Sequence, residues 1–316
     1  MKRTMKKYIG IAWALLLAVQ VGHAQPMFQF SQYMFNDYAI NPAIGGTNDY
    51  WQIRSNYRLQ YAGLNDGPQT YMLGAYGPHK TMPMGYGGFI FNDIVGPISY
   101  LGMYGSYAYN IQISGDIRLS MGLLAGVVQQ KIDMAAISPE DPVFLEATPN
   151  KFIPDGTLGV YLYTSQYFFG VSMSHLFFNN MSLLSEYDEG FNIADARLKP
   201  YFNIQGGYKY NIDRNFDLEP SVLMKASPNF DFITDINIRT IYQKMVWGGL
   251  GVRYNFKNME SIIVFLGYNY NDMINIGYSY DIGLSTLAKT TYGSHEIMIG
   301  VKFNDIRKSK SRRKIR

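Results

Sequence analysis

The feature that most constrains the fold of this chain is an alternation of apolar and polar side chains with a period of two. In residues 51–61 the odd-numbered positions are mainly Trp, Ile, Tyr and Leu, and the even-numbered ones are Gln, Arg and Asn. Residues 232–242 and 293–303 show a similar pattern. Successive side chains of a β-strand point to opposite faces, so the alternation predicts strands rather than helices.

Fourteen such runs are predicted, and most of them have 10–13 residues. They are 49–61, 68–78, 85–95, 98–110, 114–131, 154–164, 166–175, 200–211, 215–226, 231–242, 245–256, 259–271, 273–284 and 293–303. Strands of globular proteins usually have about 5–6 residues, whereas a tilted membrane strand needs about 9–11. The runs therefore predict an all-β fold, a transmembrane antiparallel β-barrel of outer-membrane type with about fourteen strands. A secreted β-sandwich or propeller is the alternative, and it explains the strand length less well.

The connections between the predicted strands differ in length in a regular way. The two longest, 132–153 and 176–199, follow odd-numbered strands, and the connections after even-numbered strands are short. Outer-membrane barrels have short periplasmic turns and longer outer loops. The pattern thus favours a barrel whose N-terminus is periplasmic.

The composition agrees with a membrane barrel. Charged residues make up 16% of the chain, below the roughly 25% of soluble domains, and the mean hydropathy of −0.12 is too low for a bundle of membrane helices. Tyr and Phe gather at the ends of the predicted strands, where aromatic rings form girdles at the membrane interface. The absence of Cys excludes disulfides, thiolate zinc sites and a cysteine nucleophile.

The two ends of the chain differ from the body. Residues 1–24 have a basic start, an apolar core at 9–21 and small residues at Gly22 and Ala24, which predicts a cleaved signal peptide rather than a membrane anchor. The last residues, 304–316, form a basic tail near +6, whereas the body is near −6. We therefore expect no nucleic-acid partner. The predicted division is a signal peptide (1–24), a periplasmic N-terminal segment (25–48), a barrel (49–303) and a basic periplasmic tail (304–316).

Both flanking segments have two interpretations. The aromatic N-terminal segment is either a plug or docking strand for a partner, or a lid that only stabilises the barrel mouth. The basic tail either contacts anionic lipid headgroups or an acidic partner, or is a disordered end.

Charged side chains within the predicted strands fall on the polar face. A charge on the lipid face would cost about 2–4 kcal/mol for Arg or Lys near the midplane, so these side chains are expected to point into the lumen. The expected set is Arg54, Arg58, Arg118, Asp217, Glu219, Lys225, Asp235, Arg239, Arg253, Glu296 and Lys302. Because the charges have both signs, an ion-pair network that closes the lumen is favoured. The alternative is a water-filled pore.

Candidate catalytic and metal-binding residues are few. After signal cleavage the histidines are His79, His175 and His295, and Ser294 faces away from the adjacent His295 on a strand. We therefore expect no enzyme activity, no cofactor and no metal centre. Acidic residues of the outer loops are either a calcium site or, more simply, a solvated surface. These residues are Glu140, Asp141, Glu146, Glu186, Asp188, Glu189 and Asp195.

Two segments of the chain carry distinctive motifs. The first comprises Gln29, Phe30, Ser31, Gln32, Tyr33, Met34, Phe35 and Asn36, followed by Asn41, Pro42 and Ala43. The second is the terminal strand with Gly293, Ser294, His295, Glu296 and, at its end, Phe303. Together these motifs resemble the PorP/SprF family of outer-membrane proteins. The likeness covers essentially the whole mature chain, although the basic extension after Phe303 is longer than the family needs.

The resemblance implies a location in the outer membrane of a Gram-negative bacterium and a part in type IX protein secretion and gliding motility. Its implied partners are outer-membrane lipid, secretion or motility proteins in the periplasm or at the surface, and a secreted cargo or adhesin. The first motif is expected to dock a partner. The strand number leaves an alternative, a channel or transporter of hydrophobic solutes.

Overall fold

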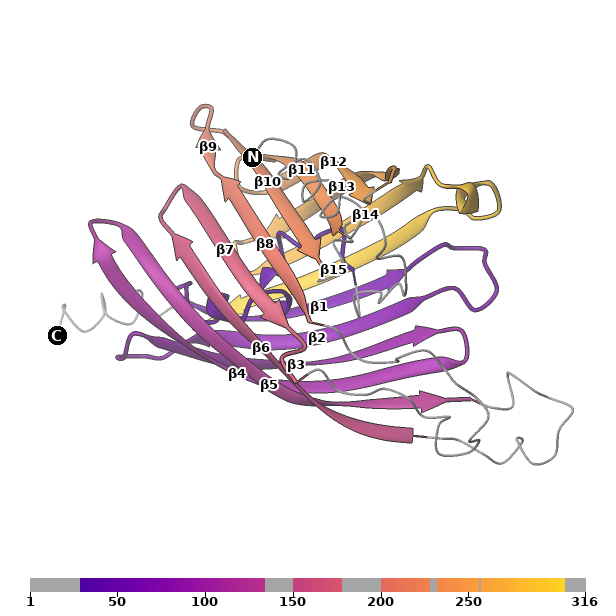
Figure 1. Cartoon of the computed structure of the whole chain (residues 1–316). Helices are drawn as coiled ribbons and strands as arrows, with labels where there is room; N and C mark the ends of the chain where they lie inside the picture. Colours follow the sequence, from indigo (N-terminus) through magenta and orange to yellow (C-terminus); the bar gives the residue numbers. More distant parts are fainter. Residues whose placement is uncertain (1–28, 134–149, 178–199, 228–231, 256, 305–316) are drawn as a thin grey trace, which may run out of the picture.

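The protein is a closed β-barrel (Figure 1). The computed structural model describes residues 29–133, 150–177, 200–227, 232–255 and 257–304. The predicted signal peptide, most of the basic tail and the acidic residues of the predicted outer loops therefore lie outside the described residues. Among those described, no helix has the length and apolarity that a membrane crossing requires.

The wall consists of antiparallel strands in chain order. They are β1 (Trp51–Leu59), β2 (Gln69–Pro78), β3 (Met84–Val95), β4 (Ile98–Ser114), β5 (Ile117–Ile132), β6 (Asn150–Tyr163), β7 (Tyr167–Ser174), β8 (Tyr201–Tyr208), β9 (Tyr210–Asn211), β10 (Phe216–Ala226), β11 (Phe232–Tyr242), β12 (Val246–Asn255), β13 (Met259–Tyr270), β14 (Ile274–Gly283) and β15 (Ser294–Phe303). Both β8 and β9 pair with β10 and are separated only by Lys209, so they act as one strand. The wall thus has fourteen strands, which confirms the predicted fold.

Pairing of the first and last strands closes the ring. Trp51 of β1 lies opposite Phe303 of β15, and the pairing continues to Leu59 opposite His295. On the far side β10 pairs with β11, so every strand has two neighbours. Closure leaves no sheet edge in the lipid, where an unpaired backbone N–H or C=O would be costly. We call the β1–β15 pairing the seam.

The two ends of the barrel are distinguished by their connections. At one end, the short-turn rim, the connections include 79–83, 115–116, 164–166, 243–245 and 271–273. The opposite end, the long-loop rim, carries 60–68, 133–149, 175–200 and 284–293, together with the short turn 96–97. Short turns face the periplasm in outer-membrane barrels, so we expect the short-turn rim to be the periplasmic one.

The predicted boundary between the fourth and fifth strands was wrong. The turn between the fourth and fifth strands was placed at 111–113, but it lies at Gly115 and Asp116. Gly115 has φ +56, a conformation that suits glycine in a tight turn. The alternation of Ile111 and Ile113 simply continues β4 toward this turn.

Alternation along the strands gives the wall an apolar outside. Leu250, in the middle of β12, is 61% exposed on this face. Exposed aromatic side chains ring the short-turn rim as a girdle. They are Tyr86, Tyr107, Tyr109, Tyr167, Phe169, Tyr208, Tyr210, Phe216, Tyr242, Tyr268, Tyr270 and Phe303.

We expect Leu250→Arg to lower the free energy of unfolding by about 2–4 kcal/mol, because the new charge would face hydrocarbon. The measurement is urea unfolding of the protein in phospholipid vesicles. Met82→Arg is the control, since Met82 is 50% exposed in the short turn 79–83. Equal, small effects of the two substitutions would mean that the exposed apolar face meets water instead of lipid.

Candidate functional site: the filled lumen

The N-terminal segment lies inside the barrel (Figure 1). Ser31 lies beside Glu296, two residues from the long-loop end of β15. Gly46 packs against Gly85, the second residue of β3 at the short-turn rim. The segment therefore runs along the lumen from one rim toward the other. We call residues 29–48 the plug.

Short 3-10 turns shape the plug. They are η1 (Asp37–Ala39) and η2 (Pro42–Ile44). A further 3-10 turn, η4 (Thr286–Lys289), lies outside the plug, in the connection after β14. The Asn41 side chain accepts a hydrogen bond from the Ala43 N–H at 3.0 Å and so caps η2. Its amide also donates to the Val160 carbonyl of β6 at 3.1 Å. The Asn41–Pro42–Ala43 motif thus builds a turn and attaches it to the wall.

Inward-facing serines of the wall bind the plug at several places. Ser120 of β5 donates to the Ala43 carbonyl at 2.5 Å, and Ser172 of β7 donates to the Ile40 carbonyl at 2.7 Å. Other contacts join plug side chains to the wall. They are Tyr33 to Ser221 of β10 (3.0 Å), Tyr38 to Ser106 of β4 (2.5 Å) and Asn36 to Asn56 of β1 (2.8 Å). The plug is therefore held around most of the circumference.

Aromatic packing fills the space between these contacts. Tyr38 stacks on Tyr76 of β2 with ring centroids 4.0 Å apart. Phe35 packs against Trp247 of β12 at 4.1 Å, and the Arg239 guanidinium lies over the Phe35 ring at 4.2 Å. The core of the protein is thus the contact between plug and wall.

Gly122 of β5 has no side chain, and this lets η2 approach the strand closely. A Cβ atom on Gly122 would lie 2.3 Å from the Ala43 nitrogen and 2.5 Å from the Pro42 carbonyl carbon. These are backbone atoms, which cannot move aside as the end of a flexible side chain could. Glycine at this position is a requirement of the plugged lumen.

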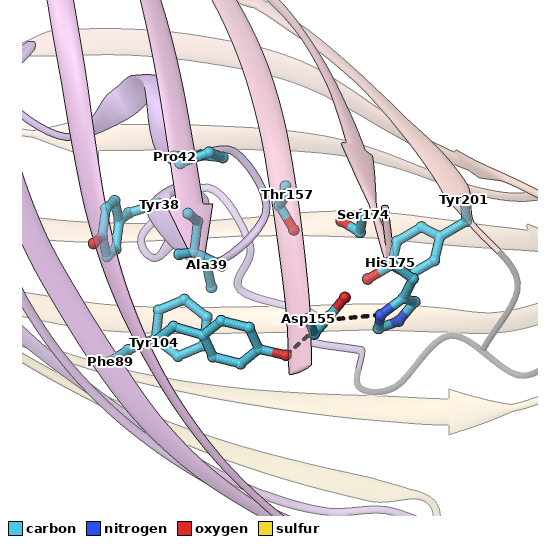
Figure 2. Close-up of a pocket in the computed structure, with 11 residues that line it drawn as sticks. Tyr38, Ala39, Pro42, Phe89, Tyr104, Asp155, Thr157, Ser174, His175 and Tyr201 are labelled. Carbon is cyan, nitrogen blue, oxygen red and sulfur yellow. Dashed lines mark hydrogen bonds and ion pairs between the residues drawn. The ribbon is translucent and has the colours of Figure 1, made fainter. Parts of the chain in front are cut away.

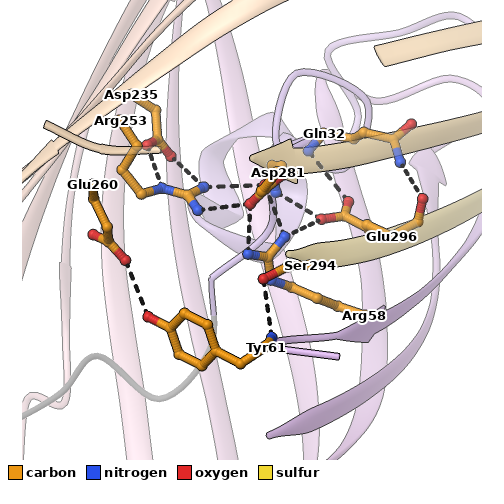
Figure 3. Close-up of polar contacts among 10 residues, drawn as sticks. Gln32, Arg58, Tyr61, Asp235, Arg253, Glu260, Asp281, Ser294 and Glu296 are labelled. Carbon is orange, nitrogen blue, oxygen red and sulfur yellow. Dashed lines mark hydrogen bonds and ion pairs between the residues drawn. The ribbon is translucent and has the colours of Figure 1, made fainter. Parts of the chain in front are cut away.

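Five buried charges form a cluster near the long-loop rim (Figure 3). Arg58 pairs with Asp281 at 2.7 Å and with Glu296 at 3.4 Å. Arg253 pairs with Asp235 at 2.7 Å and with the same Asp281 oxygen at 3.0 Å. We call these residues the seam cluster. Its side chains are at most 3% exposed, so each charge depends on its partners.

The plug completes the seam cluster through Ser31. Its hydroxyl donates to Asp281 at 2.7 Å and accepts from Arg58 at 2.8 Å and from Arg253 at 3.2 Å. Its backbone N–H donates to Glu296 at 2.7 Å. A hydroxyl has one donor and two acceptor positions, and all three are used here.

The structure separates the predicted lumen charges into several groups. Arg58, Asp235, Arg253 and Glu296 meet in the seam cluster, which also contains Asp281, a residue that sequence reasoning missed. Lys225 of β10 is buried beside the cluster and interacts electrostatically with Asp235. The other predicted charges lie elsewhere: Arg54 donates to Gln52, Arg239 pairs with Glu219, Asp217 and Glu219 contact Lys209, Lys302 lies over Tyr50, and Arg118 is exposed at the short-turn rim.

The predicted terminal-strand residues divide between the two faces. Ser294 accepts a hydrogen bond from the Tyr61 N–H at 3.1 Å, and Glu296 points into the lumen. His295 contacts the Tyr278 hydroxyl at 2.7 Å in an exposed position. Phe303 lies in the girdle near Trp51, with ring centroids 6.3 Å apart, and Gly293 has φ +77 just before the strand.

A second polar group lines a small cavity beside the plug (Figure 2). Asp155 accepts a hydrogen bond from the Tyr104 hydroxyl at 2.7 Å and lies 2.9 Å from His175 Nδ1. The cavity measures about 20 Å³, and the one beside the seam cluster about 10 Å³. Such volumes suit one or two water molecules but no organic solute.

The sequence alone offered a partial signal for Asp155 and Asp281. Each lies at an inward position of its strand, and Asp281 follows the outward-facing Tyr278 and Tyr280. Side-chain parity would have placed both in the lumen, although it would not have named their partners.

A protein-family comparison identifies the filled barrel. The model of the type IX secretion system membrane protein PorP/SprF matches residues 22–301, which include the plug and every strand except the last two residues of β15. The chain belongs to the PorP/SprF family. As a member of a type IX secretion family with a barrel fold, it resides in the outer membrane and contacts lipid.

Among the similar solved structures, one supports the barrel fold. The toluene transporter TbuX of Ralstonia pickettii is 10% identical with a TM-score of 0.54, and the match covers 87% of this chain and 94% of that one. Omp33 of Acinetobacter baumannii is 9% identical with a TM-score of 0.45, covering 82% and 100%. A FadL homologue of Pseudomonas aeruginosa is 12% identical with a TM-score of 0.43, covering 80% and 89%. No curated protein matches the sequence.

We expect Gly122→Ala to lower the free energy of unfolding by about 1–3 kcal/mol, because the added methyl group would overlap the plug backbone. Gly105→Ala is the matched control, since a Cβ at Gly105 meets no atom within 4 Å. Alanine costs less conformational entropy than glycine in a strand, so this control should be neutral or stabilising. Denaturant titration of both variants in vesicles is the measurement, and equal effects would contradict the close fit of plug and wall.

Proposed function

We propose that the protein is a non-enzymatic outer-membrane component of type IX secretion and gliding motility. In this role it anchors or presents a secreted cargo or adhesin, or couples periplasmic partners to the outer membrane. The observation that carries the proposal is the filled lumen of a PorP/SprF barrel. A wall packed around its own N-terminal segment suits a rigid anchor better than a conduit.

The position of the contacts favours partners at the rims. Much of the plug is buried against the wall, and Ser31 and Ala43 are fully buried. The connections between strands, in contrast, lie at the two rims, outside the sheet. Binding residues are often found on loops that a rigid scaffold positions. We therefore assign cargo or surface partners to the long-loop rim and periplasmic machinery to the short-turn rim.

Deleting the gene should reduce the amount of at least one secreted cargo at the cell surface, because that cargo would lose its anchor or its coupling to the machinery. Surface labelling followed by identification of the labelled proteins measures this outcome. A plasmid copy of the gene is the control and should restore display. Unchanged display of every secreted protein would overturn the proposed role.

The alternative, a channel or transporter of hydrophobic solutes, draws on the fold it shares with the toluene transporter TbuX. At 10% identity this likeness concerns the fold alone. The burial of Ser31, Gln32 and Ala43 of the plug against the wall argues against an open route for solutes.

Purified full-length protein should produce no stepwise conductance in a planar lipid bilayer, because plug and side chains fill the lumen. A general porin inserted under the same conditions is the control. Stable channel steps, or flux of an aromatic solute into liposomes, would favour the alternative and count against an anchor with a closed lumen.

A further inference from the structure

The pairing register of the seam is not fully determined by the alternation of side chains in its two strands. The seam joins β1 and β15, which lie at opposite ends of the barrel sequence. A slip of one residue would turn Arg58 or Glu296 toward lipid, so side-chain parity forbids it. A slip of two residues keeps every side chain on its own face. Some other contact must therefore distinguish the native register from a two-residue slip.

Glu296 is placed to make this distinction. It lies directly opposite Arg58 across the seam and is fully buried. Each of its carboxylate oxygens is shared between the plug and β1. Oε1 accepts from Gln32 N at 3.2 Å and from Asn56 Nδ2 at 3.2 Å, and Oε2 accepts from Ser31 N at 2.7 Å and from Arg58 Nη1 at 3.4 Å.

Ser31 and Gln32 extend these contacts over both sides of the seam. The Ser31 hydroxyl joins Arg58 of β1 to Asp281 of β14, and the Gln32 side chain donates to the Glu296 backbone carbonyl at 3.2 Å. These shared hydrogen bonds form only if Asp281 of β14, Glu296 of β15 and Arg58 of β1 keep fixed positions along their strands relative to one another. A two-residue slip of β1 would move Arg58 about 6–7 Å along the strand and break these bonds.

We propose that the seam is a binding site for a turn of peptide, that its ligand is the chain's own segment Ser31–Gln32, and that occupancy of this site selects the register in which the barrel closes. The site recognises two successive backbone N–H groups through Glu296 and a small hydroxyl side chain through Asp281, Arg58 and Arg253. The proposal does not depend on the cargo or partner of the protein.

The wall itself could also select the register. Arg54 lies opposite Gly300, and a Cβ on Gly300 would lie 2.4 Å from an Arg54 nitrogen. This fit also belongs to one register. If it alone fixed the seam, the plug would only fill space, and removing the Ser31 contacts would leave the register unchanged.

The test uses full-length protein with pairs of introduced cysteines, since the natural chain has none. Ser55 and Ile299 are opposite each other in the native register and point outward, so Ser55→Cys with Ile299→Cys reports that register. Ser55→Cys with Ile297→Cys, or with Val301→Cys, reports a slip of two residues in either direction. Opposite strand residues are close enough for a disulfide, and oxidation during refolding into vesicles followed by gel analysis measures each product.

In the parent sequence we expect the native disulfide to dominate. Ser31→Ala should increase the slipped disulfides about tenfold during refolding, because it removes charge-assisted hydrogen bonds present only in the native register. The matched control is Ser120→Ala, which removes the buried hydrogen bond that Ser120 of β5 donates to the plug carbonyl of Ala43, away from the seam. It should keep the parent distribution.

Gln32→Ala is the second, milder variant and guards against a failure of Ser31→Ala to fold. It removes the side-chain contact to the Glu296 carbonyl but keeps the backbone contacts, so a smaller increase in slipped products is expected. If neither variant yields more slipped disulfide than Ser120→Ala, the proposal is overturned and the wall alone sets the register.

Discussion

Hydrocarbon offers no hydrogen-bonding partner, and this constraint determines the rest of the structure. Each backbone group in the membrane must be paired within the protein, so the sheet has to close and the first strand has to meet the last. Closure of fourteen strands encloses a lumen that must be filled by side chains, water or a separate segment. Here the chain supplies the filling from the residues that precede β1. The inner face of the wall, which is polar because polar side chains alternate with apolar ones along each strand, is the surface that binds the plug.

The buried charges are better understood as setting geometry than as adding stability. Removing a carboxylate and a guanidinium from water costs several kcal/mol each, and pairing often only balances that cost. The seam cluster joins five strands, β1, β11, β12, β14 and β15. Such a cluster is satisfied in one arrangement of these strands, which makes misaligned closure costly. The neutral hydroxyl of Ser31 fits this role, since it adds hydrogen bonds without adding charge.

Sequence reasoning reached the fold because a period of two is a local property. It assigned Arg58, Arg253 and Glu296 to the lumen from parity alone, and their side chains are buried there. Parity could not tell which inward charges meet. Arg54 and Arg58 share a strand and a face, yet one contacts Gln52 and the other Asp281. That difference depends on the tilt of neighbouring strands and on the path of the plug.

The path of the plug was the least predictable feature. Ser31 meets residues 250 and 265 positions away, and no local pattern encodes a contact of that range. The aromatic character of residues 28–35 indicated burial against something, without saying whether that was a partner or the barrel itself. Glycines of the wall that face the plug, such as Gly122, mark where the plug backbone approaches most closely. A glycine in a strand can equally mark a bulge or a tight bend, so its presence alone did not locate the plug.

The location of the motif also limits how a partner can use it. Phe30, Ser31 and Gln32 are at most 4% exposed, so a partner can bind these side chains only if the plug leaves the lumen. Its departure would remove three hydrogen bonds from the Ser31 hydroxyl and expose five paired charges to a water-filled barrel. Docking through this motif and an intact closed barrel are therefore alternative states of the same chain. A partner that binds the closed state must instead contact the rims, where binding does not require the plug to leave the lumen.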